Sequence, residues 1–245
     1  MIGAMAKAAQ ASKPAPKILG FDCAGRGCAA AVLAGDRVAA RRAEKMERGQ
    51  AERLMPLIAE TLKEAGIAPA DLDLIAVTTG PGGFTGIRIG LAAARGLALA
   101  AGIPAVGVSN FAAAAAAVPS ASRRDRALVA AIESKREEFY LQVFAPGMDE
   151  GGEGLLVHPR DLQDFLPAGK LLLTGDAALR LLPWLKDRDA LVAPGSGPPD
   201  PSDVARLGLE LWRKGEAPPP RPLYLRAPDT STPRARKTSG LKARA

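Results

Sequence analysis

The sequence predicts an α/β protein of two lobes, the second of them shortened. Its 245 residues, 47% of them apolar, suffice to bury a substantial core, and because only 4% are aromatic that core must be built from Ala, Leu, Val and Ile. Apolar strand-like runs alternate with stretches of helical periodicity along the whole chain. A Gly-Pro-Gly-Gly turn at residue 80 joins one such run to a helix rich in Gly and Ala.

The first half of the chain begins with three predicted strands, at 17–24, 28–35 and 36–45. A helix is expected over 51–66, where Pro56 indicates a start or kink and Gly66 the end. Strands at 72–79 and 103–109 enclose a second helix. One face of the first helix is apolar and carries Leu54, Leu57, Ile58, Thr61, Leu62 and Ala65. Three strands, helix, strand, helix, strand is the unit of the actin/Hsp70/sugar-kinase (ASKHA) architecture, which we therefore predict.

The second half repeats this pattern loosely. A strand pair is predicted at 127–134 and 137–145, and further strands at 155–159 and 170–177. Short helices are expected near 160–166 and 177–186, and an extended, polyproline-like segment at 217–222. A last helix over 203–215 is expected to be capped by Ser202 and to bury a stripe of Val204, Leu207, Leu211 and Trp212.

Charge and composition divide the chain into four parts. We expect a disordered leader at 1–16, an N-terminal lobe at 17–108, a C-terminal lobe at 109–227 and a basic disordered tail at 228–245. The net charge is +7, but residues 229–245 contribute +4 and the leader +2, so the folded part is nearly neutral. An RNA-binding module would rest on the tail alone, which could add salt-sensitive contacts to phosphates.

Cysteine usage and hydropathy favour a cytoplasmic protein. Cys23 and Cys28 flank a predicted hairpin turn, where two buried thiols are favoured over a bridge. No uninterrupted run of about 18 apolar residues predicts a membrane span. The leader lacks the apolar segment of a signal peptide.

The glycine turn and the helix after it allow two interpretations. Its free N–H groups could cradle a phosphate, or the smooth helix could pack closely on another helix. The spacing matches neither the P-loop nor the dinucleotide fingerprint. Composition alone favours equally a simple tight turn before a core helix. Thr85 is a candidate helix cap, and Gly86, Gly90 and Ala94 recur on one helix face.

At this turn the chain resembles a known family. The run GPGGFTGIRIG is similar to the GPGSFTGxRIG signature of the TsaB family, formerly called YeaZ. Weaker similarity in the right order spans about residues 17–227. The turn residues that carry the resemblance are Gly80, Pro81, Gly82, Gly83, Phe84, Thr85, Gly86 and Arg88.

The side chains available argue against catalysis by this chain. His158 is the only histidine, and no Cys/His cluster has metal-ligand spacing. The related TsaD proteins carry an HxxxH pair on the first long helix, where this chain has Gln50 and Arg53. Asp22 could place Mg²⁺ beside nucleotide phosphates, or could simply bond to the hairpin turn; the loop after it lacks the hydroxyl that grips phosphate.

The resemblance implies a non-catalytic scaffold. Such a subunit pairs with TsaD and, with TsaE, supports N6-threonylcarbamoylation of adenosine 37 in tRNAs reading ANN codons, contacting tRNA indirectly and no membrane. The isolated chain then needs no cofactor, although ATP and Mg²⁺ can act in the complex. An ATP-dependent small-molecule kinase or ATPase of the same fold is the alternative.

The resemblance also implies that the two N-lobe helices form the surface for TsaD, or for a second copy in a homodimer. A charged side chain at Gly90 should then block pairing without unfolding the chain. The expected partner-binding residues are Leu54, Leu57, Ile58, Leu62, Ile87, Gly90, Leu91 and Ala94. The sequence equally allows these apolar residues to face the sheet of their own lobe.

Overall fold

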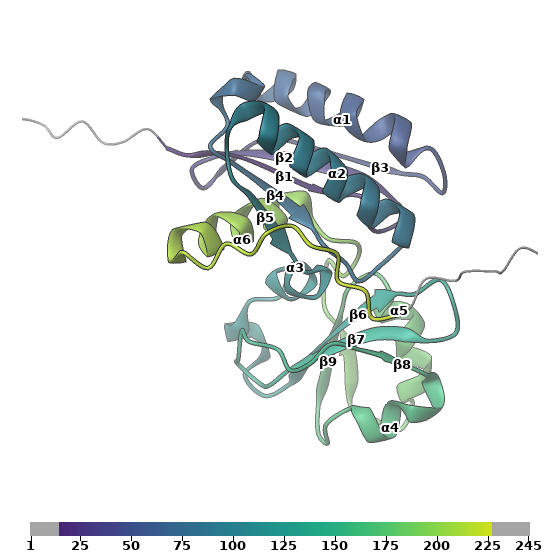
Figure 1. Cartoon of the computed structure of the whole chain (residues 1–245). Helices are drawn as coiled ribbons and strands as arrows, with labels where there is room; N and C mark the ends of the chain where they lie inside the picture. The colour runs from purple at the N-terminus through teal and green to yellow at the C-terminus, as the bar shows by residue number, and fades with distance from the viewer. Residues whose placement is uncertain (1–14, 227–245) are drawn as a thin grey trace, which may run out of the picture.

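The computed structural model describes residues 15–226, so the expectations for the tail and for most of the leader lie outside the described residues. The described chain forms two lobes, each built on a five-stranded sheet (Figure 1). The strands are β1 (Lys17–Asp22), β2 (Gly27–Ala34), β3 (Arg37–Lys45), β4 (Leu74–Thr78), β5 (Ala105–Val108), β6 (Ala127–Glu133), β7 (Phe139–Phe144), β8 (Leu155–Val157), β9 (Leu171–Thr174) and β10 (Ala190–Val192). The helices are α1 (Gln50–Ala65), α2 (Phe84–Ala101), α3 (Asn110–Ala116), α4 (Leu162–Phe165), α5 (Ala178–Leu181) and α6 (Pro201–Lys214).

The first sheet has the strand order β3-β2-β1-β4-β5. The first three strands form an antiparallel meander, and β4 and β5 join β1 in parallel after the crossover helices α1 and α2. Alternate residues of β1 and β4 point to opposite faces: Leu19 and Ile75 meet α1 and α2, whereas Ile18 and Leu74 meet α6. Both faces of this sheet are therefore covered.

The second sheet repeats the connectivity of the first. Its order, β8-β7-β6-β9-β10, is again a three-stranded meander followed by two parallel strands. The crossover helices α4 and α5 have four residues each, against 16 and 18 in α1 and α2. This duplication confirms the predicted actin/Hsp70/sugar-kinase architecture and its shortened second lobe.

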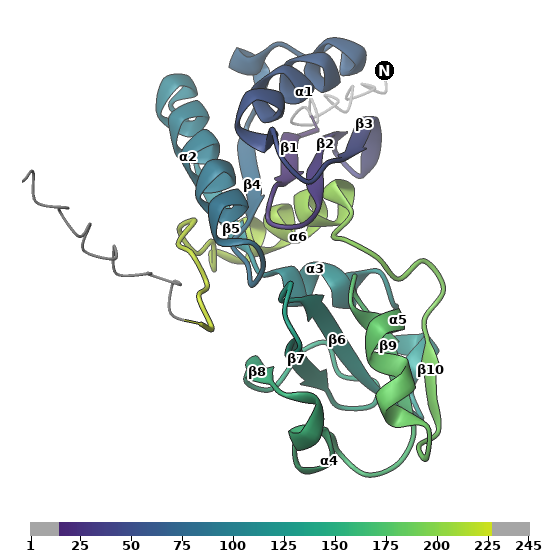
Figure 2. The same cartoon turned by 90° about the vertical axis from the view of Figure 1, so that its right-hand side faces the viewer.

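The helix that follows each repeat packs on the opposite lobe. Helix α3 follows the first repeat but covers the second sheet through Phe111 and Ala114, and α6 follows the second repeat but covers the first sheet. Both helices therefore lie between the two sheets (Figure 2). The expected C-terminal lobe at 109–227 is corrected in this respect, because residues 201–214 belong to the core of the first lobe.

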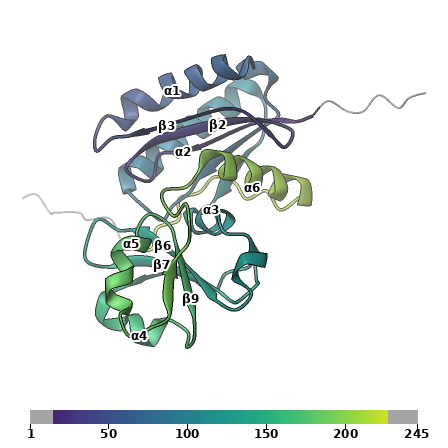
Figure 3. The ribbon, with the colours of Figure 1, turned by 180° about the vertical axis from the view of Figure 1, so that it is seen from behind.

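Helix α6 lies unusually close to the first sheet, on the face opposite α1 and α2 (Figure 3). A Cβ on Gly20 would lie 2.5 Å from the carbonyl oxygen of Pro201, and one on Gly208 would overlap the side chain of Ala76. Small residues are needed at such a contact. The buried stripe is accordingly Val204, Ala205, Gly208 and Leu209.

Two sequence expectations for α6 are thereby corrected. Leu207 and Leu211 are only partly buried, and Trp212 is exposed. The N-cap is Asp200, whose carboxylate accepts from the backbone N–H of Ser202 at 2.8 Å, rather than Ser202 itself.

The chain after α6 is a strap without helix or strand, as expected for 217–222, and it joins the two lobes. The carbonyl oxygen of Pro218 accepts from Gly107 N at 2.9 Å, and Leu223 N donates to Thr79 O at 2.8 Å. At its end, the Arg226 guanidinium pairs with Glu138, the residue before β7, at 2.9 Å. The strap therefore runs from the edge of the first sheet past α2 to the second lobe (Figure 1).

Smaller features of the fold were predicted unevenly. Cys23 and Cys28 are free and buried, as favoured by the sequence, with sulfur atoms 3.4 Å apart. Pro56 lies within α1 and marks neither end, whereas Gly66 caps it in the left-handed conformation. Helix α3 and strand β10 were not predicted.

Candidate functional site

The glycine turn between β4 and α2 rests on the loop that joins β1 to β2. Gly83 N donates to the carbonyl oxygen of Ala24 at 2.8 Å. A Cβ on Gly82 would lie 2.7 Å from the same oxygen, and one on Gly86 would overlap the carbonyl oxygen of Cys23. Gly82 and Gly86 are therefore required because two backbones touch, and α2 begins directly on the first hairpin.

The other side of the turn is held by α3 and by the strap. Gly80 has a φ of +104°, which favours glycine, and exchanges hydrogen bonds with Asn110: its N–H donates to Oδ1 at 3.1 Å and its carbonyl accepts from the Asn110 N–H at 2.8 Å. The Gly80–Pro81 peptide bond is cis. The contacts that Asn110 and the strap make with the turn were not predicted, because they join residues far apart in the chain.

Phe84 and Arg88 point away from the sheet and meet the strap. The Arg88 guanidinium lies 3.8 Å from the centre of the Phe84 ring, and its Nε donates to the Tyr224 hydroxyl at 3.1 Å. Phe84 and Tyr224 have ring centres 4.8 Å apart. Thr85 was predicted to cap α2, and this prediction is wrong: Thr85 is exposed within the first turn of the helix. Gly83 occupies the cap position, with no side-chain cap hydrogen bond.

Asp22 ends β1 in a closed environment. Its Oδ1 accepts from the Thr78 hydroxyl at 2.5 Å and from Ala24 N at 3.1 Å, and the residue is 4% exposed. Burial raises the pKa of this carboxyl, while the hydrogen bonds from Thr78 and the loop backbone act in the opposite direction. These contacts join β1, β4 and the hairpin turn.

The cavities at Asp22 and next to it are small. Asp22 lines a cavity of about 160 Å³ with Arg26 and Pro201 among others. A separate cavity between the lobes, lined by Ala24, Gly82, Glu133 and Asp176 among others, holds about 10 Å³. Small-molecule sites usually hold roughly 300–1,000 Å³. Burial raises the pKa of Asp176 to about 6. Within residues 15–226 no group of three metal-ligating side chains occurs either. The hydrogen bonds of the Asp22 carboxylate to Thr78 and Ala24 support the local fold.

The expected partner-binding residues face the sheet of their own lobe, which corrects that prediction. All eight (Leu54, Leu57, Ile58, Leu62, Ile87, Gly90, Leu91 and Ala94) are buried in the core between the sheet and the two helices. A Cβ on Gly90 would already touch Val77 and Cys23 at 3.5 and 3.6 Å. The leucine and isoleucine side chains of this set supply the first lobe with its core, so in this structure the set is not exposed to a partner.

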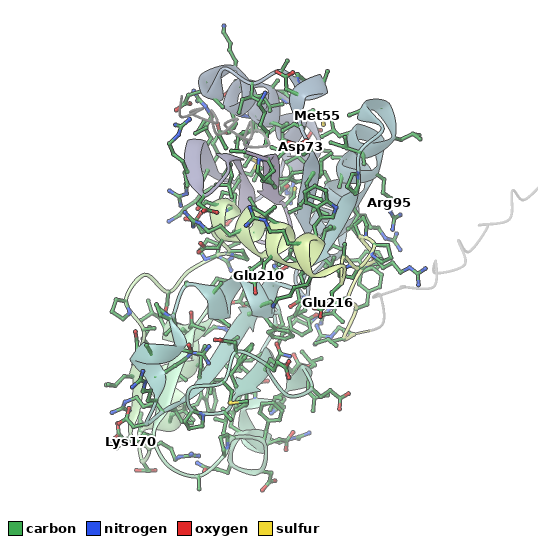
Figure 4. All side chains as sticks on the ribbon, turned by 90° about the vertical axis from the view of Figure 1, so that its left-hand side faces the viewer. Met55, Asp73, Arg95, Lys170, Glu210 and Glu216 are labelled. Carbon is green, nitrogen blue, oxygen red and sulfur yellow. The ribbon has the colours of Figure 1, made fainter. Side chains whose placement is uncertain are left out.

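The outer face of α2 is exposed and nearly uncharged over its second half. We use this name for Ala92, Arg95, Gly96, Leu99 and Ala100, of which Leu99 is 86% exposed. On the neighbouring α1, Met55 is 45% exposed. Figure 4 shows Met55 and Arg95 on the outside of the first lobe. An apolar, solvent-facing helix surface of this kind is typical of an interaction site.

Helix α2 is also long and apolar enough to cross a membrane, and 28% of it is buried in the structure. Within the described chain it is the single helix with this property. The criterion is weak evidence here, because helices packed on a sheet meet it as well, and the buried face of α2 belongs to the core of the first lobe.

Comparison with known proteins gives consistent results. Residues 42–156 match the family model described as TsaD, tRNA N6-adenosine threonylcarbamoyltransferase. An uncharacterized protein of Mycobacterium tuberculosis is 32% identical over 185 residues, which cover 74% of this chain and 77% of the relative. The Escherichia coli tRNA threonylcarbamoyladenosine biosynthesis protein TsaB is 35% identical over 124 residues, about half of each chain (51% and 53%). The structure of YeaZ from Pseudomonas aeruginosa superposes with a TM-score of 0.70 at 26% identity, covering 86% of this chain and all of that one.

The duplicated sheets place this chain among proteins of the actin/Hsp70/sugar-kinase architecture. The relatives above share its sequence and its fold over most of the described residues. The chain belongs to the TsaB (YeaZ) family.

Proposed function

We propose that this chain is an accessory, non-catalytic subunit in tRNA threonylcarbamoyladenosine biosynthesis. In this role it pairs with TsaD and, together with TsaE, supports N6-threonylcarbamoylation of adenosine 37 in tRNAs reading ANN codons, in the cytoplasm. Support comes from the named relatives, which are TsaB biosynthesis proteins of Escherichia coli and Haemophilus influenzae.

The outer face of α2 is the observation that carries the pairing. Ala92, Gly96 and Ala100 leave a smooth helix surface to which another helix can approach closely, and Leu99 supplies an apolar contact. Burying Leu99 in an interface would remove an unfavourable exposure of apolar area. The same surface is available for a homodimer, which would compete with TsaD.

The side chains support an accessory role rather than catalysis. Residues 42–156 match the TsaD model but contain no histidine. The single histidine of the chain, His158, lies just outside this region. A kinase or ATPase of this architecture needs an open cleft between its lobes, and here the backbone of Gly82 fills the space beside Ala24. We therefore do not propose the kinase alternative.

Co-purification with the TsaD of the same organism tests the proposal. Ala92→Glu and Leu99→Glu each put a charge on the outer face of α2, and we expect each variant to fold but to bind TsaD at least about tenfold more weakly. Leu179→Glu is the matched control: this leucine is 73% exposed on α5 of the second lobe, and its replacement should leave pairing unchanged.

Two outcomes would contradict the proposal. If the wild-type chain does not bind TsaD at micromolar concentration, the accessory role is wrong. If both α2 variants bind as tightly as wild type, the interface lies elsewhere. Analytical ultracentrifugation of the same variants reports on the homodimer.

A further inference from the structure

A second, larger cavity lies where the glycine turn, the second lobe and the strap meet. It holds about 400 Å³ and shares only Gly82 and Lys135 with the small cavity lined by Ala24 and Asp176. Three segments that are distant in sequence form its walls. They are residues 81–84 of the turn, residues 134–136 with Tyr140 of the second lobe, and residues 223–226 of the strap.

The charges at this cavity are mainly positive. The Lys135 ammonium lies next to the N-terminus of α2, 3.4 Å from the position of a Cβ on Gly83, and no carboxylate contacts it within the described chain. Arg136 and Arg226 also line the cavity. The neighbouring carboxylates pair with arginines: Glu133 with Arg180 at 3.1 Å and Glu138 with Arg226 at 2.9 Å. The charge of Arg226 is therefore balanced, and Lys135 is the main source of positive charge at the cavity.

An ammonium placed at the N-terminus of an 18-residue helix meets the positive end of the helix dipole. Like charges are thereby brought together, with Arg88 one turn further along the helix. A bound anion would relieve this repulsion, and the cations would raise the local concentration of anionic ligands.

Aromatic rings give the cavity a second chemical character. The Phe84 and Tyr224 rings form its wall beside the cations, tilted by 31° to each other, and Tyr224 is 37% exposed. Aromatic side chains next to lysine and arginine are the groups on which nucleobases stack while the backbone phosphate is neutralised.

We propose that this cavity binds a nucleoside phosphate, with the phosphate at Lys135 and Arg136 and the base against the Phe84–Tyr224 side. The volume suits one nucleotide unit. Two sources carry this chemistry, an unpaired nucleotide of an RNA strand and a free nucleotide. The RNA source rests on the proposed function in tRNA modification.

Binding measurements on the full chain test this inference with three probes: a single-stranded hexaribonucleotide, 5′-AMP and adenosine. We expect Lys135→Gln to weaken hexanucleotide binding about tenfold and to reduce the slope of log K against log salt by about 0.7. Lys186→Gln, at an exposed position elsewhere in the second lobe, makes the same change in net charge and should alter affinity less than about twofold.

The aromatic wall is tested separately. Tyr224→Leu should weaken binding about tenfold, whereas Tyr224→Phe keeps the ring and should bind nearly as wild type. Adenosine, which lacks the phosphate, should not bind measurably. If 5′-AMP binds with the same dependence on Lys135 and the hexanucleotide does not, the site exists and its source is a free nucleotide.

The inference is overturned if neither phosphate-bearing probe binds, or if Lys135→Gln and Lys186→Gln weaken binding equally. Equal losses would mean that net charge alone governs the association. Pairing with TsaD is measured in parallel and should be normal for Lys135→Gln. A wild-type chain that binds the hexanucleotide in a Lys135-dependent manner but does not bind TsaD would refute only the proposed function.

Discussion

The inner and outer faces of α2 both carry small residues, but these residues have opposite roles on the two faces. On the inner face, Gly86 lies against the β1–β2 loop so closely that a Cβ would overlap the Cys23 carbonyl oxygen. On the outer face, nothing lies within 4 Å of a Cβ placed on Gly96. Glycine-rich composition therefore does not by itself indicate a partner surface. Close approach within the chain explains Gly86, and only the exposed residues remain available to another protein.

Gly90→Glu should produce the largest effect, and it tests whether the inner face is packed. The new carboxylate would be buried next to Val77 and Cys23 without a partner, at a cost of several kcal/mol, comparable to the roughly 5–15 kcal/mol that stabilise a domain. We expect a chain that is largely unfolded by circular dichroism, in contrast to the folded variant that the sequence led us to expect.

Gly90→Ala is the control for that experiment. Its methyl group meets only ordinary van der Waals contacts and gains about 1 kcal/mol of helix propensity. A Gly90→Glu protein with wild-type unfolding in urea would mean that this face does not rest on the sheet.

Gly86→Ala should destabilise the fold by about 3 kcal/mol or more, because the methyl group meets backbone atoms that cannot rotate away. Besides the overlap with Cys23, it would lie 3.4 Å from Ala24 Cα. The free energy of unfolding in urea measures the loss. A change below about 1 kcal/mol would show that the hairpin loop moves easily away from α2.

Asp176→Asn extends the comparison to the small cavity between the lobes, which Asp176 and Gly82 both line. Burial raises the pKa of Asp176 to about 6, so the folded state keeps a proton that the unfolded state releases near pH 4. Between these values the wild-type free energy of unfolding falls with rising pH on account of this group, by on the order of 3 kcal/mol in total.

Asparagine does not ionise and can still accept from Glu133 N, as the Asp176 carboxylate does at 2.8 Å. The stability of Asp176→Asn relative to wild type should therefore rise from pH 4 to pH 6 and level off above it. Parallel curves of unfolding free energy against pH for the two proteins would rule out a buried Asp176.

Gly96→Ala should have the smallest effect and the opposite sign to Gly86→Ala. The methyl group finds open space, so helix propensity alone acts and should add about 1 kcal/mol. Differential scanning calorimetry resolves such a change. A loss of stability at this position would show that the outer face of α2 is covered within the chain itself.

Local patterns in the sequence predicted most of the secondary structure but not which helix face is buried. Alternation and glycine punctuation located the strands of both lobes except β10, and the C-terminal end of α1 at Gly66. In α6, hydrophobicity favoured Leu207 and Trp212, whereas the structure buries Ala205 and Gly208. Contact with Gly20 and Ala76 requires small residues there, and that requirement comes from strands far away in the sequence.

The candidate sites were predictable to a similar extent. The glycine turn was located by its own residues, because the turn, the strand before it and the helix after it are continuous in sequence. The cavity where the glycine turn, the second lobe and the strap meet was not predicted. Its residues 134–136 and 223–226 come together only after both lobes and the strap have formed. No local pattern marks Lys135 and Tyr224 as neighbours.

The exchange of α3 and α6 between the lobes affects the way in which this chain can be synthesised. The first sheet emerges early from the ribosome, yet one of its faces stays open until α6, with Val204 and Ala205, has been translated. Contacts of such sequence separation form slowly. During translation, the apolar side chains Ile18, Leu74 and Val106 of this face remain accessible to chaperones. We therefore expect aggregation to be most favourable during translation, before α6 has covered this face of the first lobe.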